Sequence, residues 1–141
     1  MMKEIIFVCT GNTCRSPLAE SYANTHVEGN SFGSRGLSVM SRSINMKSLK
    51  IIERESLKMP SLPRQLTDED TKNSIIITMT SGHKMQILMN HPDANVYTLG
   101  ELSGENTDIS DPYGGTEADY EYTYQELRRF IDKIDFQSDI F

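Results

Sequence analysis

The sequence is short of basic residues, and this shortage narrows the range of its partners. Among 141 residues, 14 lysines and arginines stand against 20 aspartates and glutamates, which gives a formal net charge of −6. Proteins that bind the nucleic-acid backbone without sequence preference carry the opposite sign of charge. We therefore expect no nucleic acid among the partners of this chain.

Long apolar runs and cysteines are also scarce. The longest apolar stretch near the N-terminus covers only residues 5–9, which is too short for a secretory signal and far too short to span a bilayer, and no other segment does better. Cys9 and Cys14 are too few for the disulfide framework of a secreted domain. The sequence thus predicts a cytoplasmic protein that does not bind membranes, with both thiols reduced.

No internal repeat, linker or low-complexity tract divides the chain. Hydrophobic residues make up 37% of the sequence and charged residues 24%, which is within the range of chains that fold around a core. A length of 141 residues suits one domain of ordinary size. We expect residues 1–141 to form a single domain, and we expect the protein to be a monomer.

Predicted strands and helices alternate along the chain. Compact apolar runs predict buried strands at residues 4–9 and 74–79, and two shorter segments predict strands at residues 35–40 and 95–99. Ser16 is the predicted N-cap residue of the first helix, because a proline follows it at the first helical position. Apolar residues at helical spacing predict helices at residues 16–27, 46–57, 81–91 and 120–134, with one helical turn from Thr67 and a loop over residues 100–115.

This alternation predicts the α/β fold class with a parallel, doubly wound sheet. In such folds, ligands bind at the carboxyl ends of the strands, near the point where the strand order reverses. The loop after the first strand and the loop after the last strand are therefore the places to look for a functional site.

A cysteine and an arginine bracket the loop after the first predicted strand. Cys9 ends the apolar run, and Arg15 follows six positions later, where a helix begins. Backbone N–H groups at a helix N-terminus suit a phosphate dianion, and the arginine fork can hold two phosphoryl oxygens. Gly11 and Asn12 tolerate the positive φ that such a loop needs. Because the same positive surroundings would stabilise a thiolate at Cys9, the loop would supply both a nucleophile and an anion cradle.

Phosphoryl transfer to sulfur also needs a group that protonates the leaving group and later activates water. Asp111 is the best candidate, since it lies in the loop after the last predicted strand. Pro112 would stiffen this loop, Tyr113 can form a wall of the pocket, and Ser16 can donate a hydrogen bond to the thiolate of Cys9. A buried apolar cysteine and an acidic turn are the plain structural alternatives, and the combination of the two loops favours an active site over them.

The second cysteine and the histidines leave less specific signals. Cys14 is either a small thiol that faces the helix or a redox partner of Cys9, with which a reversible disulfide would protect the nucleophile from overoxidation. His26, His83 and His91 show no spacing typical of zinc ligands. We therefore expect no metal site.

The segment VCTGNTCRSP at residues 8–17, together with the late Asp-Pro-Tyr at residues 111–113, resembles the low-molecular-weight protein tyrosine phosphatase family over essentially the whole chain. The resemblance implies a four-stranded parallel sheet flanked by helices, with the phosphate-binding loop after the first strand. It also implies cofactor-free hydrolysis of phosphorylated protein substrates through a phosphocysteine. The implied catalytic residues are Cys9 as nucleophile, Arg15 as phosphate clamp and Asp111 as general acid and base, and the implied phosphate- and substrate-binding residues are Thr10, Gly11, Asn12, Thr13, Cys14, Ser16 and Tyr113.

Two positions depart from the usual tyrosine-specific pattern. Thr13 stands where that pattern has isoleucine, and Gly114 stands where it has a second aromatic residue. Both residues resemble the protein-arginine phosphatase branch found in Gram-positive bacteria. The hydroxyl of Thr13 can orient the phosphoryl group or a substrate N–H, and Tyr113 can stack on a guanidinium plane as well as on a phenyl ring. A neutral exchange of two β-branched residues is the alternative explanation for Thr13.

Four other functions compete with a protein-arginine phosphatase. A tyrosine phosphatase of the same class is the main alternative. An arsenate reductase would need further cysteines for its redox relay, and the sequence has none beyond Cys14. A sugar-transport phosphocarrier or a phosphoprotein-binding module would not need both Arg15 and Asp111, which equip the site for hydrolysis.

Overall fold

The apolar run near the N-terminus forms the central strand of the sheet. In the computed structural model, which describes residues 3–141, all five residues of β1 (Ile5–Cys9) are buried. Their side chains alternate between two hydrophobic clusters: Phe7 and Cys9 belong to the larger cluster, and Ile6 and Val8 belong to the smaller one. Both faces of the strand are therefore covered, as a continuous apolar run predicts.

Four parallel strands make up the sheet, in the order β2-β1-β3-β4. They are β1, β2 (Phe32–Gly36), β3 (Ile75–Thr78) and β4 (Val96–Thr98). The chain leaves β1 for β2 on one side and later passes to β3 on the other side. The strand order therefore reverses between β1 and β3, and the carboxyl ends of these two strands flank the point where ligands bind in such sheets. The predicted α/β class and parallel sheet are confirmed.

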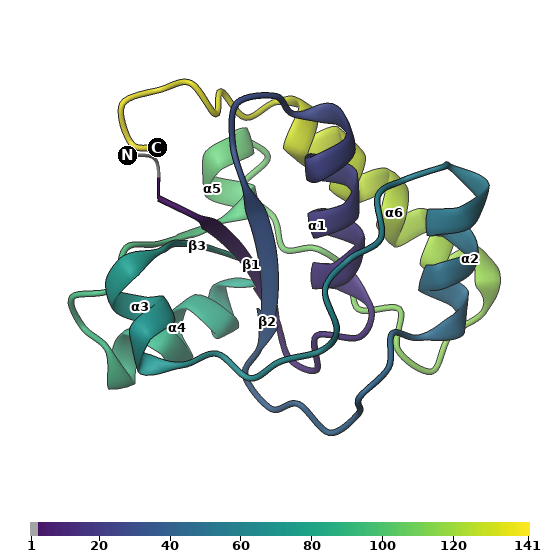
Figure 1. Cartoon of the computed structure of the whole chain (residues 1–141), viewed down its shortest axis with the longest axis horizontal. Coiled ribbons are helices and arrows are strands. Elements are labelled where there is room, and N and C mark those ends of the chain that lie inside the picture. Colours follow the sequence, from purple (N-terminus) through teal and green to yellow (C-terminus); the bar gives the residue numbers. More distant parts are fainter. Residues whose placement is uncertain (1–2) are drawn as a thin grey trace.

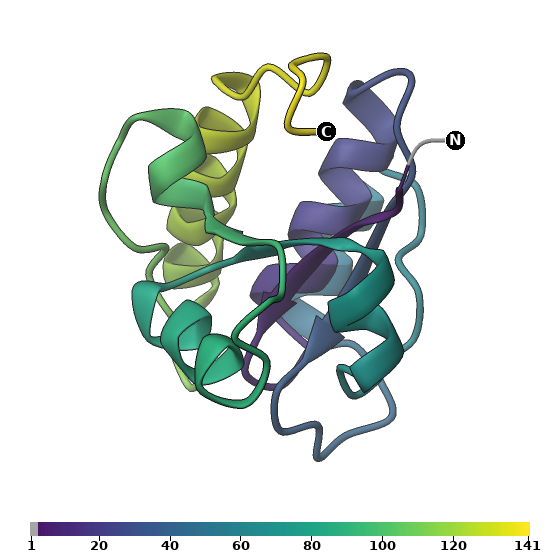
Figure 2. The ribbon, with the colours of Figure 1, turned by 90° about the vertical axis from the view of Figure 1, so that its left-hand side faces the viewer.

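Helices cover both faces of the sheet, as Figures 1 and 2 show. One face carries the helices that pack on the larger cluster, and α3 and α4 lie on the other face. The amino end of β1 and the C-terminus lie on the side of the molecule away from the carboxyl ends of the strands (Figure 1). The helices are α1 (Arg15–His26), α2 (Met46–Arg54), α3 (Asp68–Asn73), α4 (Ser81–Asn90), α5 (Leu99–Ser103) and α6 (Glu117–Asp132).

The second strand lies earlier in the chain than the sequence predicts. The expected strand covered residues 35–40, but β2 ends at Gly36 and the chain then turns into a loop. A Cβ atom at Gly36 would lie 2.8 Å from the carbonyl oxygen of Thr10 and 2.6 Å from a methyl carbon of Val39. Glycine is therefore required where β2 passes the loop after β1, and two glycines in five residues hide the strand from the sequence pattern.

Four helix starts differ from those that the sequence predicts, and one of them is the start of α6, which lies at Glu117, three residues before the predicted position. Ser16 does not cap α1, which begins one residue earlier without a side-chain cap. Thr80, and not Ser81, caps α4. The region expected to be loop, residues 100–115, begins with the short helix α5, which Thr98 starts with a capping box. The other predicted helices end or begin within three residues of the observed bounds.

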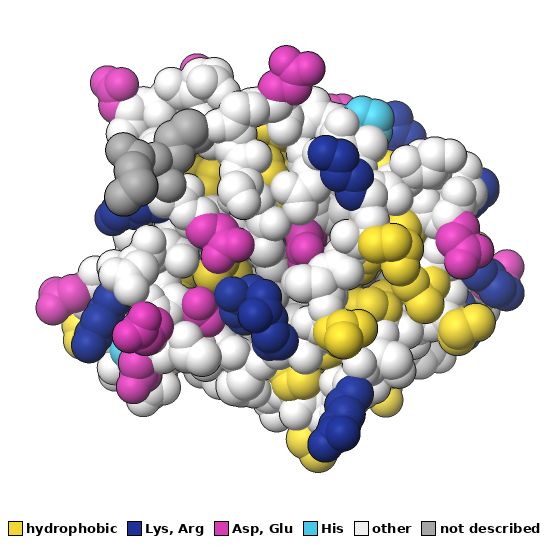
Figure 3. Space-filling view, in the orientation of Figure 1, with side chains coloured by type: hydrophobic (Ala, Val, Ile, Leu, Met, Phe, Trp, Pro, Cys, Tyr) yellow, Lys and Arg dark blue, Asp and Glu magenta, His cyan; other side chains and the backbone are white. Residues whose placement is uncertain are grey.

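Charged side chains of both signs are scattered over the face shown in Figure 3, and hydrophobic side chains gather toward the side of α2. Within residues 3–141, none of the helices combines the length and the apolar character that a membrane crossing requires.

Candidate active site

The loop between β1 and α1 turns tightly beneath the carboxyl end of the sheet. Asn12 is fully buried and has a φ of 56°, in the left-handed region that asparagine tolerates better than most residues. Gly11, for which the same freedom was expected, does not use it. The left-handed turn therefore depends on Asn12 alone.

Neighbouring segments hold three carbonyl groups of this loop. The amides of Leu37 and Ser38 donate to the carbonyl oxygens of Cys9 and Thr10 at 3.1 and 2.8 Å, and a third amide, from the residue before α2, donates to the carbonyl oxygen of Thr13 at 3.0 Å. In a trans peptide the C=O and the following N–H point in opposite directions. The N–H groups that follow these carbonyls are thus turned away from the flanking segments, as an anion cradle requires.

The thiol of Cys9 lies under this loop and contacts a hydroxyl group. Cys9 is 3% exposed, and its Sγ lies 2.9 Å from Oγ of Ser16, which is completely buried. Ser16 lies in the first turn of α1, whose N-cap residue is Cys14, and its hydroxyl contacts the sulfur atom of Cys9. A hydroxyl at this distance can donate to a thiolate and stabilise it.

A buried carboxylate determines the direction of the hydrogen bonds around Ser16. Glu20 is 4% exposed and accepts the hydroxyl hydrogen of Ser34 at 2.5 Å, so Ser34 accepts in turn from Nδ2 of Asn12 at 2.9 Å. Oδ1 of Asn12 accepts from the amide of Arg64 at 2.9 Å, which fixes the orientation of the Asn12 amide. Nδ2 of Asn12 also donates to Ser16. The hydroxyl hydrogen of Ser16 can therefore go to the sulfur atom of Cys9 at 2.9 Å or to the carbonyl oxygen of Arg35 at 3.5 Å, and the contact to sulfur is the shorter one.

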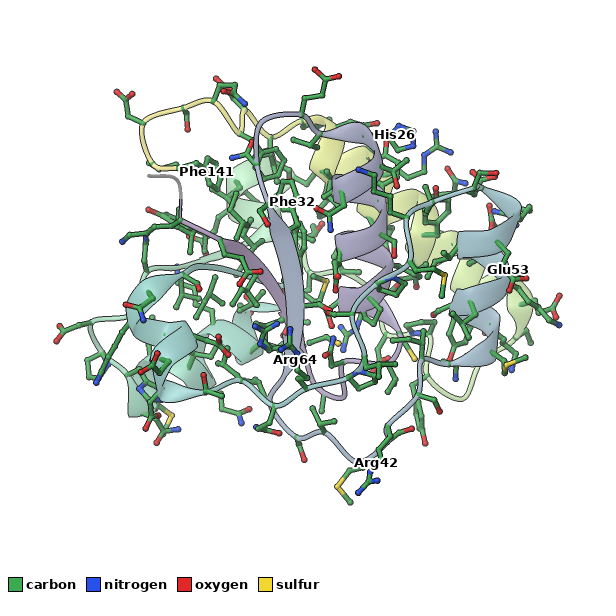
Figure 4. All side chains as sticks on the ribbon, in the orientation of Figure 1. His26, Phe32, Arg42, Glu53, Arg64 and Phe141 are labelled. Carbon is green, nitrogen blue, oxygen red and sulfur yellow. The ribbon has the colours of Figure 1, made fainter. Side chains whose placement is uncertain are left out.

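The carboxylate of Glu20 also binds the segment before α3. It accepts hydrogen bonds from the amide and the hydroxyl of Ser61, at 2.8 and 2.9 Å. Figure 4 shows Arg64, farther along the same segment, beside the carboxyl end of β2. One buried anion thus joins α1, β2 and this segment beneath the loop.

Arg15 links the first loop to the second. Its guanidinium is buried, with Nη1 donating to the carbonyl oxygen of Ile109 at 3.2 Å and Nη2 lying 3.5 Å from Oδ2 of Asp111. Asp111 is open to solvent, and its Oδ1 accepts from the amide of Tyr113 at 3.1 Å. The cation and the carboxylate therefore meet at the same place, where a phosphoryl group and its leaving group would also meet.

The two loops enclose a pocket of about 300 Å³ together with the loop that follows β2. That third loop supplies Ser38, Met40 and Ser41. Figure 4 shows Arg42 projecting from the same loop at the rim of the molecule. Asn12 and Ser16 support the pocket from below and do not line it. The predicted residues that line it are Cys9, Thr10, Gly11, Thr13, Cys14, Arg15, Asp111 and Tyr113.

Cys14 lies at the floor of the pocket and faces the last helix. Its Sγ is 3.4 Å from the hydroxyl of Tyr120 and 3.7 Å from Oγ1 of Thr13. Burial raises the pKa of the Cys14 thiol above its usual value. Cys14 is therefore packed as a neutral thiol against α6, which agrees with the first of its two expected roles, and a disulfide with Cys9 stays a prediction.

Comparison with protein families decides the relationship of the chain. Residues 4–136 match the family model described as low molecular weight phosphotyrosine protein phosphatase. The chain belongs to this family. The expected resemblance is thus confirmed, and this phosphatase has the family's fold and its phosphatase chemistry.

Staphylococcal proteins and a Geobacillus protein are among the relatives of this phosphatase. The low molecular weight protein-tyrosine-phosphatase PtpB of Staphylococcus epidermidis is 43% identical over 136 residues, which cover 95% of this chain and 98% of the relative. PtpB of Staphylococcus aureus is 42% identical over 137 residues, which cover 93% and 96%. Among solved structures, the YwlE arginine phosphatase from Geobacillus stearothermophilus superposes with a TM-score of 0.86 at 33% identity and covers 94% of this chain and 90% of its own.

Sequence analysis of this phosphatase missed several residues that build the site. Glu20 and Ser34 lie beneath the loop, and Met40 lies at its rim. His83 contacts the loop from the start of α4, with Nε2 at 2.9 Å from Oγ1 of Thr10. Only His83 carried a usable signal, because it follows the end of a predicted buried strand, where parallel sheets collect functional side chains. The other three come together only through the fold.

Proposed function

We propose that this phosphatase hydrolyses phosphoarginine in proteins through a phosphocysteine intermediate. The observation that carries the proposal is the position of the Cys9 thiol, which contacts the Ser16 hydroxyl. The same pocket is lined by the buried Arg15 and by Asp111, whose side chains lie 3.5 Å apart. These groups supply a nucleophile, an anion clamp and an acid within one pocket.

In the first step, the thiolate of Cys9 attacks phosphorus and an S–P bond forms. The bond between phosphorus and the guanidine nitrogen breaks, and that nitrogen keeps the electron pair and takes a proton from the carboxylic acid of Asp111. Loop N–H groups and the guanidinium of Arg15 hold the phosphoryl oxygens as negative charge redistributes among them. In this arrangement the ion pair between Arg15 and Asp111 opens when the phosphoryl group binds.

In the second step, water attacks the phosphocysteine. The carboxylate of Asp111 takes a proton from this water, and the S–P bond breaks with its electron pair returning to sulfur. Ser16 donates its hydroxyl hydrogen to the thiolate that forms, and this donation makes sulfur a better leaving group. Inorganic phosphate then leaves the pocket.

Three features support arginine as the substrate residue. Thr13 presents a hydroxyl at the pocket, where isoleucine would suit a phenyl ring better. Tyr113 also lines the pocket, is 77% exposed, and can stack on a guanidinium plane. Gly114, next to it, has a φ of 78° and no atom within 4 Å of the place that a Cβ would take, so no second aromatic side chain stands beside Tyr113 at this position. The similarity to the YwlE arginine phosphatase agrees with this assignment.

Phosphorylated proteins are the expected substrates, and we expect the phosphatase to act on them as a monomer in the cytoplasm. A thiolate nucleophile needs a compartment that keeps thiols reduced.

The second candidate is hydrolysis of phosphotyrosine. It is favoured by the 43% identity to a relative that is named a protein-tyrosine-phosphatase. The cysteine, arginine and aspartate of the proposed mechanism would serve both substrates, so only the pocket walls separate the two functions.

Measured kcat/KM on phosphoarginine and phosphotyrosine peptides of matched sequence tests the proposal. Cys9→Ser serves as the blank, because it lacks the thiolate, and Thr13→Ile is the specificity probe. We expect a preference for phosphoarginine that Thr13→Ile weakens or reverses. A preference for phosphotyrosine that this substitution leaves unchanged would overturn the arginine assignment and keep the mechanism.

A further inference from the structure

A histidine outside the family motifs contacts the phosphate loop. His83 lies in the first turn of α4 and is 8% exposed. Its Nε2 is 2.9 Å from Oγ1 of Thr10, the residue that directly follows Cys9. Thr10 lines the pocket, and within residues 3–141 its hydroxyl makes no hydrogen bond other than the one to His83. The contact joins the carboxyl ends of β1 and β3 at the point where the strand order reverses.

The surroundings of the ring keep it uncharged. Burial, followed by the positive charge of Arg15, lowers the pKa of His83 to about 4, and Asp111 and Asp108 oppose this shift only in part. At neutral pH the imidazole is therefore neutral and carries a single N–H, on one of its two nitrogens.

The two nitrogens of the ring have unequal surroundings. Nδ1 of His83 is buried and has no hydrogen-bond partner among the described residues, whereas Nε2 faces the hydroxyl of Thr10. A hydrogen on Nδ1 would be a buried donor without an acceptor, which proteins rarely tolerate. The arrangement therefore favours the tautomer with its hydrogen on Nε2, and in that tautomer the oxygen of Thr10 is the acceptor.

This direction leaves the hydroxyl hydrogen of Thr10 unused. A hydroxyl group has one hydrogen to donate and two lone pairs to accept with. Because one lone pair of Thr10 takes the His83 N–H, the hydrogen is free to serve a group in the pocket. A phosphoryl oxygen is an acceptor, whereas a guanidinium only donates, so the free hydrogen suits the phosphoryl part of a ligand.

We propose that His83 is a positioning residue that makes the hydroxyl of Thr10 a hydrogen-bond donor to the phosphoryl group bound in the pocket. This inference rests on the proposed function in assigning the pocket to a phosphoryl group, but it does not depend on whether that group comes from arginine or tyrosine. The opposite direction, with Thr10 donating to Nε2, would make the hydroxyl an acceptor for a substrate N–H.

Nitrogen NMR of the imidazole distinguishes the two directions. In the folded protein, ¹⁵N shifts and long-range couplings of His83 identify which ring nitrogen carries the hydrogen. We expect the Nε2–H tautomer, and we expect the ring to stay neutral until the pH approaches 4. The Nδ1–H tautomer would overturn the proposal, and so would a ring that is charged at neutral pH.

A double-mutant cycle with inorganic phosphate tests the contact to the ligand. The Kd of phosphate is measured by calorimetry for Thr10→Val, for His83→Leu and for the double variant. One hydrogen bond to a charged group corresponds to a change of about tenfold in affinity. We expect Thr10→Val to weaken phosphate binding by about that factor. We expect His83→Leu to weaken it in the parent and to have no further effect once Thr10 is valine.

Conservative variants separate positioning from folding. Thr10→Ser keeps the hydroxyl and His83→Gln offers an amide N–H in place of Nε2–H, so both should retain more phosphate affinity than Thr10→Val and His83→Leu. His91→Gln, at the other end of α4, is the matched control and should bind phosphate as the parent does. Losses that add in the double variant, or parent-like affinity of Thr10→Val, would overturn the proposal. Because phosphate itself is the probe, a failed arginine preference would leave these results interpretable.

Discussion

Two loops meet at the pocket, and they differ in how they are built. The loop of residues 9–16 is enclosed: Cys9 is 3% exposed and Arg15 is 4% exposed. The loop of residues 111–115 is open: the side chain of Asp111 is 58% exposed and Tyr113 is 77% exposed. The half of the pocket suited to hold phosphate is therefore inside the fold, and the half suited to move protons faces solvent.

Hydrogen bonding explains the difference between these loops. The first loop bonds to segments far away in the sequence, through its carbonyl groups and through the buried side chain of Asn12. In the second loop, the amide of Tyr113 bonds to Asp111 and the amide of Gly115 bonds to the carbonyl of Pro112, so these bonds stay within the loop. Donors that are already oriented stabilise charge without reorganisation, whereas an exposed loop with local bonds opens at low cost. The fold thus fixes the anion site and leaves the acid loop separately adjustable.

The largest expected effect that separates the loops comes from Asp111→Asn. Loss of the acid should lower kcat/KM on phosphopeptides by a factor of about 10² to 10⁴, since general acid–base catalysis contributes that much and kcat/KM reports the step that forms the phosphocysteine. The loss should be smaller on an aryl phosphate whose phenol is acidic, because that leaving group needs no proton in the first step. Steady-state kinetics on both substrates measures the difference.

Phosphate affinity supplies the control for this comparison. Asp111→Asn should bind inorganic phosphate at least as tightly as the parent, because it removes a negative charge beside Arg15. Asp93→Asn, in the exposed loop before β4, is the matched control and should leave both kcat and affinity unchanged. An equal loss of kcat/KM with both leaving groups would contradict the assignment of Asp111 as the acid.

The buried half of the site is tested by Glu20→Gln, with a smaller expected effect. The amide would place a donor against the donors of Ser34 and Ser61, so the unfolding free energy should fall by about 1 to 3 kcal/mol. With its donor direction disturbed, Ser16 should stabilise the thiolate less, and alkylation of Cys9 by iodoacetamide should need a higher pH. Urea unfolding and the pH profile of alkylation measure the two effects.

Glu53→Gln is the matched control for this substitution. Glu53 is exposed on α2 and projects from the edge of the molecule in Figure 4. It should change neither the unfolding free energy nor the alkylation profile. If Glu20→Gln behaved in the same way, the buried carboxylate would not direct the hydrogen bonds at the sulfur atom.

The sequence predicts best those strands and helices that carry a local hydrophobic pattern. The runs at β1 and β3 are buried on both faces and are apolar except for Thr78 at the end of β3, so their pattern is plain. β2 contains Gly33 and Gly36, and its place in the sheet depends on pairing with β1 and on the close passage of Thr10. Such contacts between distant segments leave no periodic trace in the sequence.

The candidate site divides in the same way. Cys9, Arg15 and Asp111 were predictable because each stands beside a strand or helix end and carries chemistry that a simple packing role does not need. Glu20 and Ser34 were not, because a glutamate on a helix and a serine in a strand have many ordinary uses. Their role depends on a buried network that only the folded chain assembles.

The smallest expected effect comes from Gly114→Ala, which changes the open loop without touching its neighbours. Gly114 has a φ of 78° and nothing within 4 Å of a Cβ, so alanine should cost only the strain of the left-handed region, roughly 1 to 2 kcal/mol of unfolding free energy. Phosphate affinity should stay at the parent value.

Gly36→Ala is the counterpart at the enclosed loop. A Cβ at this position would lie 2.8 Å from the carbonyl oxygen of Thr10, so this variant should weaken phosphate binding. Equal weakening by both variants would show that the two loops are not independent, because strain in the acid loop would then have reached the anion site.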